Sequence, residues 1–487
     1  MRGRDSRRLV LAFAAVLLVL GACGKAVTGS PKAEGEIDAG TVAGLPVTDD
    51  SQVASGLRPG APAPGLTAQN ADNGEMDQLA LASVADLYDY WNTELPADFE
   101  GQKFTPLAKL VSYDSKGAGM KLCQTSTAGL VNAFYCSLDD SISWDRGVLL
   151  PELSKKFGKM SVVAVLAHET GHAVQFKLGA KSGISPATKT IVKEQQADCY
   201  AGAFFRWIAD GKSKRFQIST GEGLNRILAT MFFIRDPVGT DANKSGAHGL
   251  AWDREYAFQA GFGKGPRTCA KIDQKDIDSR IKEQDFADKD DNQGNVKIND
   301  EHLKELQISL DDAFKQIGGD LPKIVQNGSK CPTGKPATTP AVYCPDNNTV
   351  GIDLAVLAKL GTPPKRGQEP GADGVGIGDF AAFAEIASRY TLSVQKAVNL
   401  SLDDERAGLR TACLVGAWAR VTEQEGVGDN VLRLSPGDLD EAVAEMLMGK
   451  SLIAADINGT PVKAGFARVE AFRIGHDSAK ECTARFS

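Results

Sequence analysis

Hydrophobic residues recur with two different periods in the first half of the chain, one typical of helices and one typical of strands. Helical spacing of apolar residues predicts three helices, over residues 77–94, 162–180 and 186–209. An extended segment over residues 107–113 and a hairpin over residues 134–144 lie between the first two helices. Helices that pack on one small mixed sheet form an α+β domain, which is the fold class that we expect.

The second predicted helix carries the sequence His168-Glu169-Thr170-Gly171-His172, an H-E-x-x-H pattern. Residues four apart on a helix share a face, so the two imidazoles can bind one zinc ion. Glu169 lies one residue further round, where its carboxylate can take a proton from a water bound to that ion. The alternative is a chance match on a core helix, but the chain contains only five His. The pattern therefore predicts Zn²⁺ as cofactor and Glu169 as a catalytic base.

Two histidines do not complete a catalytic zinc site, which usually has three protein ligands and one position open to water. Glu194, on the third predicted helix, is the best-placed third ligand. Asp198 lies four residues later on the same face, where it can accept a hydrogen bond from a ligand imidazole and orient the ring. A solvated acidic stripe is the alternative interpretation of this pair.

The N-terminus predicts an export signal. Residues 1–8 are basic, and residues 9–20 form an apolar run that is too short to cross a bilayer comfortably. The sequence Leu20-Gly21-Ala22-Cys23 then resembles the lipobox of bacterial lipoprotein signal peptides, which implies cleavage after residues 1–22 and lipid attachment to Cys23. We expect an exported protein that is lipid-anchored at the outer face of the bacterial cell membrane. An uncleaved anchor and a twin-arginine signal at Ser6-Arg7-Arg8 are the alternatives.

Composition changes after the signal. Residues 23–75 are rich in Gly, Ala, Pro, Ser and Thr and nearly free of aromatic residues, which predicts a flexible tether. The whole chain has 487 residues, 42% of them hydrophobic, which is enough for two cores. Its formal charge is −7, and loss of the four Arg and one Asp in residues 1–8, +3 in sum, leaves −10. This charge argues against nucleic acid as a partner.

The cysteines indicate an internal repeat. The chain has nine, and without Cys23 eight remain, an even number that is typical of disulfides in an exported protein. Segments ending in Tyr135-Cys136 and Tyr343-Cys344 are alike, and ADCYAGAF around Cys199 corresponds to TACLVGAW around Cys413. The repeat predicts four bonds: Cys123–Cys136, Cys199–Cys269, Cys331–Cys344 and Cys413–Cys482.

Further matches extend the repeat over most of both halves. Arg254, Phe258 and Gly261 correspond to Arg468, Phe472 and Gly475. We therefore expect a tandem duplication with a first domain over residues 76–272 and a second over residues 301–487. The charged residues 273–300 between them predict a solvated linker, because the acidic cluster there lacks the turn glycine of a calcium-binding loop.

The motifs around the predicted zinc site resemble those of the bacterial neutral zinc metallopeptidase family, a group of zincins. HETGHAVQ is similar to its H-E-x-G-H-x-V-Q motif, and EQQADCYAG over residues 194–202 to its E-x-Q-A-D-C-x-A-G motif. The hairpin from Tyr135-Cys136 to Asp145 and the stretch from His248-Gly249 to Gly261 resemble two further motifs. The resemblance covers about residues 80–269. It implies a zincin-like domain with zinc bound by His168, His172 and Glu194, and Glu169 as general base.

Two departures from the family pattern concern the substrate side of the site. Ser143 stands where the family has Tyr, and Leu250-Ala251 stand where it has small polar residues. His248 is a candidate for stabilising the oxyanion of the tetrahedral intermediate. A structural histidine is the alternative.

The second half of the chain lacks the chemistry of the first. Residues 388–392, Ser-Arg-Tyr-Thr-Leu, occupy the H-E-x-x-H positions, and Gly408 and Ala412 stand in the places of Glu194 and Asp198. Val462 stands in the place of His248. We expect a degenerate copy that binds no zinc and that covers the cleft, selects substrates or docks a protein partner.

The sequence therefore predicts an exported, membrane-anchored zinc metallopeptidase that hydrolyses peptide bonds of a peptide or protein substrate. The alternative is a binding or scaffold lipoprotein of the cell envelope with a residual or structural zinc site. Glu169 favours the enzyme, because a structural zinc site needs no base.

Overall fold

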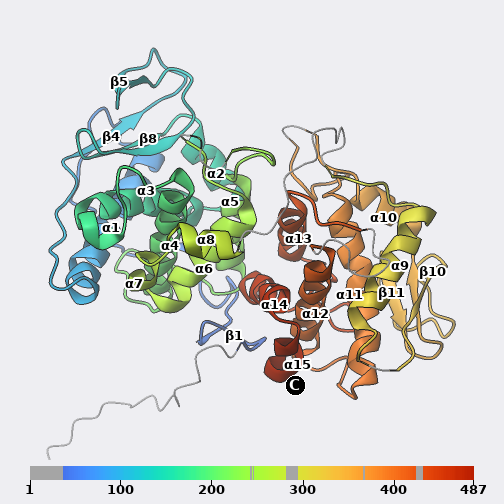
Figure 1. Ribbon diagram of the computed structural model, residues 1–487. Helices are drawn as coiled ribbons and strands as arrows, with labels where there is room; N and C mark the ends of the chain where they lie inside the picture. The colour runs from blue at the N-terminus through green and yellow to red at the C-terminus, as the bar shows by residue number, and fades with distance from the viewer. Residues whose placement is uncertain are drawn as a thin grey trace, which may run out of the picture. The chain divides into compact units, whose positions relative to one another are not determined.

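The computed structural model describes residues 37–241, 244, 246–280, 294–317, 319–365, 368–423 and 432–486 (Figure 1). The predicted signal sequence, Cys23 and residues 281–293 of the predicted linker lie outside this range. Within the described part, none of the helices has the length and hydrophobicity that crossing a membrane requires.

The first half of the chain contains these elements: β1 (Thr41–Val42), β2 (Leu45–Pro46), β3 (Gly56–Leu57), α1 (Glu75–Asp98), β4 (Lys109–Tyr113), β5 (Lys121–Leu122), β6 (Thr125–Ser126), β7 (Ala133–Cys136), β8 (Ser141–Asp145), α2 (Leu149–Phe157), α3 (Met160–Leu178), a 3₁₀ turn (Gly179–Ser182), α4 (Thr190–Ala209), β9 (Phe216–Gln217), α5 (Glu222–Phe233), α6 (Ala251–Lys264), α7 (Pro266–Cys269) and α8 (Gln274–Arg280). The second half contains α9 (Asp300–Phe314), β10 (Lys323–Gln326), β11 (Ala341–Cys344), β12 (Thr349–Ile352), α10 (Leu354–Leu360), α11 (Asp379–Ala397), α12 (Ala407–Thr422), α13 (Asp438–Leu447), α14 (Gly465–Asp477) and α15 (Lys480–Phe486).

The fold is mixed α+β, and the elements predicted from apolar spacing lie close to where the sequence placed them. The predicted helices over residues 77–94 and 162–180 correspond to α1 and α3. The third predicted helix corresponds to α4, which begins at Thr190, four residues after its predicted start. The predicted hairpin is the antiparallel pair of β7 and β8.

Each half contains one three-stranded sheet with the same pairing. In the first sheet, of order β4-β8-β7, the central β8 runs parallel to β4 and antiparallel to β7. In the second sheet, of order β10-β12-β11, the central β12 runs parallel to β10 and antiparallel to β11. In both, the antiparallel edge strand ends in Tyr-Cys, so the edge strands β7 and β11 carry equivalent cysteines.

Close helix packing through glycine also occurs in both halves. A Cβ on Gly202 of α4 would lie 1.9 Å from the Phe258 carbonyl oxygen of α6, so only glycine fits. In the second half, a Cβ on Gly416 of α12 would lie 1.9 Å from the Phe472 carbonyl oxygen of α14. The contact brings α6, which carries Arg254, against α4.

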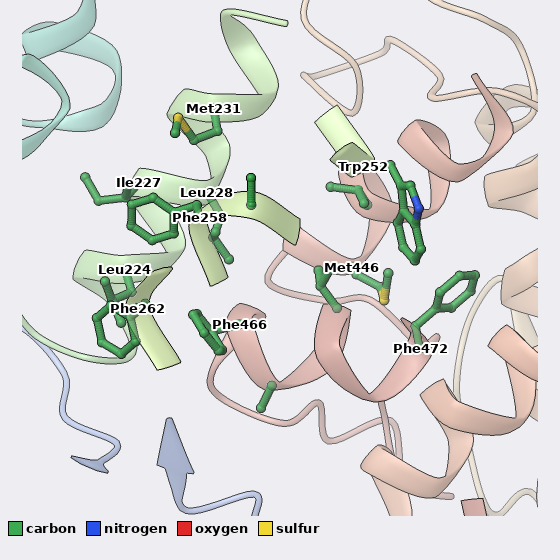
Figure 2. Packing of buried hydrophobic residues seen from close by; sticks show 14 of the residues in the cluster. Leu224, Ile227, Leu228, Met231, Trp252, Phe258, Phe262, Met446, Phe466 and Phe472 are labelled. Carbon is green, nitrogen blue, oxygen red and sulfur yellow. The ribbon is translucent and has the colours of Figure 1, made fainter. Parts of the chain in front are cut away.

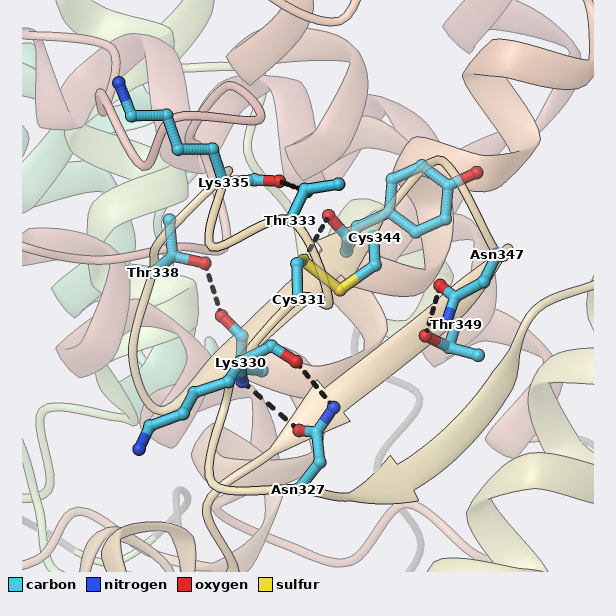
Figure 3. The surroundings of a disulfide bond; sticks show 11 residues. Asn327, Lys330, Cys331, Thr333, Lys335, Thr338, Cys344, Asn347 and Thr349 are labelled. Atoms are coloured by element: carbon cyan, nitrogen blue, oxygen red, sulfur yellow. Dashed lines mark hydrogen bonds between the residues drawn. A yellow bond between two sulfur atoms is a disulfide. The ribbon is translucent and has the colours of Figure 1, made fainter.

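All four cysteine pairs expected from the repeat lie at disulfide distance. Cys199–Cys269 joins α4 to α7, and Cys413–Cys482 joins α12 to α15. Figure 3 shows Cys331–Cys344 beside the second sheet, where the side chain of Asn327 accepts from Lys330 N–H and donates to its carbonyl. The two short links hold the edge strands, and the two long links hold α7 against α4 and α15 against α12.

Buried side chains of the two halves form one hydrophobic cluster. Figure 2 shows Leu228 of α5 and Phe258 and Phe262 of α6 close to Phe466 of α14, from the second half. The rings of Phe262 and Phe466 are 5.3 Å apart, and those of Trp252 and Phe472 are 5.7 Å apart. The second half is therefore packed directly against α5 and α6.

The predicted tether is wrong for its described part, residues 37–75. Val42 is 1% exposed, and the carbonyl and N–H of Gln69 bond to Ser112 and Leu110 of strand β4. The carboxylate of Asp50 accepts from Arg226 of α5. The segment is held by isolated apolar side chains, backbone hydrogen bonds and ion pairs of Asp50, Asp72 and Glu75, so it shows no hydrophobic periodicity in the sequence.

The beginning of the predicted linker also differs from expectation. Residues Gln274–Arg280 form α8, in which Ile277 is buried. Arg280 stacks on the Tyr256 ring at 3.9 Å and forms an ion pair with Asp253 at 3.6 Å. The charge of this segment predicted solvent exposure. Instead, Ile277 of α8 is buried, and Arg280 packs against Tyr256 and Asp253 of α6.

Candidate metal centre

Helices α3 and α4 approach closely at the point where the histidines and the acidic residues face each other. A Cβ on Gly171 would lie 2.9 Å from Cα of Ala197, so glycine between the two histidines permits this approach. Helix α3 ends at Gly179, whose φ of 54° is in the left-handed region that favours glycine. The chain then returns as α4, which places Glu194 and Asp198 beside His168 and His172.

The imidazoles of His168 and His172 both face the carboxylate of Glu194. His168 Nε2 lies 3.2 Å from Glu194 Oε2, and His172 Nε2 lies 3.5 Å from Glu194 Oε1. Ligands about 2.0–2.1 Å from a tetrahedral zinc are separated by about 3.3–3.4 Å, so this donor set fits zinc. His168 Nε2 and Glu194 Oε2 are both buried and form no hydrogen bond among the described residues. Both atoms are available as metal ligands.

The charges at this point also favour a cation. Burial alone would lower the pKa of His168, but Asp198 and Glu194 raise it to about 10. Burial would raise the pKa of Glu194, but the neighbouring His172 and His168 hold it well below its usual range. Two buried carboxylates therefore draw a proton onto the imidazoles, and a metal ion would take the place of that proton.

Asp198 orients the first histidine and is itself held by an arginine. His168 Nδ1 lies 2.7 Å from Asp198 Oδ1, and because a carboxylate can only accept, the proton is on Nδ1 and Nε2 is free for a metal. Arg254 donates to both Asp198 oxygens, at 2.8 and 2.9 Å, and to the Ile234 carbonyl at 3.0 Å. Burial raises and Arg254 lowers the pKa of Asp198, with a net shift below its ordinary value. The ion pair thus keeps the orienting group ionised.

The second histidine has a neutral partner. His172 Nδ1 lies 3.1 Å from Gln175 Oε1, and Gln175 Nε2 donates to the Lys193 carbonyl at 2.6 Å. The amide of Gln175 therefore connects the end of the histidine motif to the helix that carries Glu194. Both imidazoles are oriented through Nδ1, which leaves both Nε2 atoms facing Glu194.

Glu169 lies beside the donor set and is not part of it. Its Oε2 accepts from the backbone N–H of Tyr135, on edge strand β7, at 2.8 Å. Among the described residues its other oxygen, Oε1, has no hydrogen-bond partner. One oxygen is thus fixed by the sheet while the other is available to accept a proton.

His248 lies at the edge of the same centre. One donor atom each of His168, Glu194 and His248 lies within 4.8 Å of the others, and His248 Nε2 is 4.0 Å from Glu194 Oε2. This distance is longer than the 3.5 Å of His172, and the side chain of His248 is 35% exposed. Asp236 accepts from the backbone N–H groups of His248 and Gly249. His248 therefore lies beside the three donors, on the more open side.

The second half of the chain supports the segment that carries His248. Asp440 of α13 accepts from Ala251 N–H at 3.1 Å and Trp252 N–H at 2.9 Å, at the start of α6. It also forms an ion pair with Arg235 at 3.0 Å. Because α6 begins three residues after His248, Asp440 fixes one end of that segment.

The sequence did not reveal the roles of Arg254, Gln175, Asp236 and Asp440. Two of them, Gln175 and Arg254, were visible as motif positions, in H-E-x-G-H-x-V-Q and in the stretch that follows His248-Gly249. Asp236 and Asp440 belong to no motif. Their contacts depend on a turn and on the packing of the two halves, which leave no periodic signal.

The positions that correspond to the centre in the second half are filled by packing. Arg389, in the place of Glu169, is 0% exposed and donates to the carbonyls of Leu452, Ala455 and Asp456. A Cβ on Gly408, in the place of Glu194, would lie 2.6 Å from the Ala454 carbonyl oxygen. The Arg389 guanidinium and backbone carbonyls thus occupy these positions. Among the described residues of the second half, no histidines gather into a possible metal site.

One comparison with known proteins gives a match. Residues 42–271 match the model of the family described as "Putative neutral zinc metallopeptidase". No curated protein and no solved structure matches the chain significantly. The matched range contains all of the residues that form the centre except Asp440.

Proposed function

Since residues 42–271 belong to the putative neutral zinc metallopeptidase family, we propose that this protein hydrolyses peptide bonds with zinc held by His168, His172 and Glu194. One observation carries the proposal. A buried donor set that fits zinc lies next to a carboxylate that is oriented by the sheet yet has a free oxygen. A structural zinc site would need only the donor set.

Zinc at this site would act as a Lewis acid, polarising the scissile carbonyl and lowering the pKa of a water molecule. Oε1 of Glu169 would accept the proton of the attacking water and deliver it to the leaving amine. The Tyr135 N–H keeps the Glu169 carboxylate in one orientation during both transfers. His248 would donate from its ring to the developing oxyanion.

We further propose that the second half is a degenerate copy of the first and binds no zinc. Three observations support a tandem duplication: the same strand order and directions, the paired glycines at Gly202 and Gly416, and the equivalent disulfides. The contacts of Asp440 with the start of α6 support a role for this copy in holding the active half.

Export through the signal of residues 1–22 and lipid anchoring at Cys23 remain part of the proposal. The motif around Cys23 and the even number of remaining cysteines support both. The substrate would then be a peptide or protein outside the cell, reached from the outer face of the membrane.

The proposal is tested with a mixed peptide library and mass spectrometry. We expect protein reconstituted with zinc to cleave library peptides, the zinc-depleted protein to be inactive, and added zinc to restore cleavage. His168→Ala should bind no zinc and cleave nothing. Zinc binding without hydrolysis of any peptide would instead support the scaffold alternative.

A further inference from the structure

Three acidic side chains of the second half meet between two helix starts, away from the zinc centre. Asp379 begins α11, while Asp438 and Glu441 lie in the first turn of α13. One carboxylate oxygen of each lies within 4.8 Å of the others. We propose that Asp379, Asp438 and Glu441 form a second metal site, which takes a divalent cation of the calcium type.

Hydrogen bonds explain part of this cluster as helix capping. Glu441 Oε2 accepts from Phe380 N–H at 2.9 Å, and Asp379 Oδ2 accepts from Val296 N–H at 3.1 Å. Both oxygens of Asp438 accept from Ser435, from its N–H and its hydroxyl, at 2.8 Å each. Capping therefore holds the three carboxylates in place, but it leaves Oδ1 of Asp379 without a partner among the described residues.

The unpartnered oxygen of Asp379 points to a ligand. Asp379 is 5% exposed, and its Oδ1 is buried without a hydrogen-bond partner. A buried carboxylate oxygen without a partner loses its hydration and gains nothing in return, unless it binds a proton or a cation. The carboxylate of Glu441 lies directly against Gly378 at the start of α11.

Within the described ranges, no Lys or Arg forms an ion pair with Asp379, Asp438 or Glu441, although Arg433 and His302 line the same hollow as Asp379 and Asp438. Burial raises the pKa of Asp379 to about 6, and burial together with the neighbouring acids raises the pKa of Asp438 and Glu441 well above the usual range. A proton or a bound cation would therefore stabilise these closely spaced carboxylates.

The surroundings leave room for an ion with part of its water shell. Asp379 and Asp438 line a hollow of about 330 Å³ together with His302 and Trp418. The donors are all oxygens, which suits a hard cation and excludes the nitrogen-rich set that zinc prefers. Ca²⁺ accepts irregular geometry and solvent ligands, whereas Mg²⁺ demands a near-ideal octahedron, so a set fixed by helix caps favours Ca²⁺.

Terbium luminescence tests the site without reference to hydrolysis. Trp418 lines the same hollow and its ring stacks on Phe380, the residue after Asp379, at 5.4 Å. It is therefore close enough to sensitise bound Tb³⁺. With zinc-loaded full-length protein in calcium-free buffer, we expect saturable emission at one Tb³⁺ per chain, displaced by Ca²⁺ and much less by Mg²⁺. Ca²⁺ should also raise the melting temperature.

Variants assign the signal to the cluster. The double variant Asp379→Asn/Asp438→Asn should lose Tb³⁺ emission and the Ca²⁺-dependent rise in melting temperature, with at least about a tenfold loss of affinity. Glu445→Gln is the matched control, because Glu445 is also buried on α13, has a raised pKa and lies outside the cluster. Trp418→Phe should reduce the emission and keep the rise in melting temperature.

Three results would overturn the proposal. The first is wild-type protein that shows neither Ca²⁺-displaceable emission nor a rise in melting temperature. The second is a double variant that binds as the wild type does. The third is Mg²⁺ competing as well as Ca²⁺, which would exclude the calcium-type site. Since the readouts do not involve peptide cleavage, failure here is distinguishable from failure of the proposed peptidase.

Discussion

The Asp198 carboxylate contributes to folding stability and to zinc affinity, and removing it should lower both by amounts that can be measured separately. Asp198 is 0% and Arg254 1% exposed, and they share two hydrogen bonds of 2.8 and 2.9 Å. Asp198→Ala leaves the guanidinium of Arg254 buried without its partner, which costs about 3–5 kcal/mol of unfolding free energy. His168 also loses the acceptor that fixes its tautomer, so zinc affinity should fall about 10–100-fold.

The two effects are measured separately. Urea unfolding of zinc-free protein gives the stability change, and competition with a zinc chelator gives the affinity. Asp86→Ala is the matched control, because Asp86 is 0% exposed and pairs with the buried Arg215 at 2.7 Å, in the same half but outside the zinc centre. It should lose stability, but less than Asp198→Ala because Arg215 keeps its ion pair with Asp89, and it should keep its zinc affinity.

The reasoning is refuted by either of two outcomes. If Asp198→Ala binds zinc as tightly as Asp86→Ala, the carboxylate does not orient His168. If Asp198→Ala unfolds at the same urea concentration as the wild type, the buried pair with Arg254 contributes nothing to folding.

Three further predictions follow from the packing and the charges. Gly171→Ala should lower the unfolding free energy by about 1–3 kcal/mol and weaken zinc binding, because its Cβ would lie 2.9 Å from Ala197. Its control is Gly263→Ala on α6, which has open space around it and should raise the unfolding free energy by up to about 1 kcal/mol in the same urea assay. Asp440→Ala removes the acceptor of two N–H groups at the start of α6, so unfolding free energy should fall by about 0.5–2 kcal/mol and kcat/KM should fall while zinc content stays. Burial raises the pKa of Asp379 to about 6 against the lowering effect of the Val296 N–H and His302, so the stability that protonated Asp379 contributes is lost as pH rises through 6. Calcium-free protein should therefore have a lower melting temperature at pH 8 than at pH 5, and Asp379→Asn should reduce this difference. An unchanged difference would contradict the raised pKa.

The sequence indicated the zinc centre because its chemistry depends on helical spacing. His168 and His172 are one turn apart on α3, and Glu194 and Asp198 are one turn apart on α4, so each pair shares a face whatever the rest of the fold. The glycine between the histidines was visible too, but its steric reason required the distance to Ala197.

Features that depend on contacts between distant segments were not predictable in this way. The tether prediction for residues 37–75 was wrong because Val42 and Gln69 are fixed one at a time, by burial and by strand β4. Asp440 and the acidic cluster at Asp379 lie in the second half and belong to no sequence motif. Their partners became visible only when the two halves and the helix starts were placed in space.

The central claim is that Glu169 completes a zinc-dependent hydrolytic site without being a ligand. Glu169→Gln keeps the size of the side chain and its bond from Tyr135 N–H, and removes its basicity. The decisive measurement is zinc content and peptide hydrolysis on the same purified sample of this variant. The account predicts one zinc per chain, as in the wild type, and a rate about 10²–10⁴-fold lower. Full activity with Gln at this position would contradict the account, as would loss of the zinc.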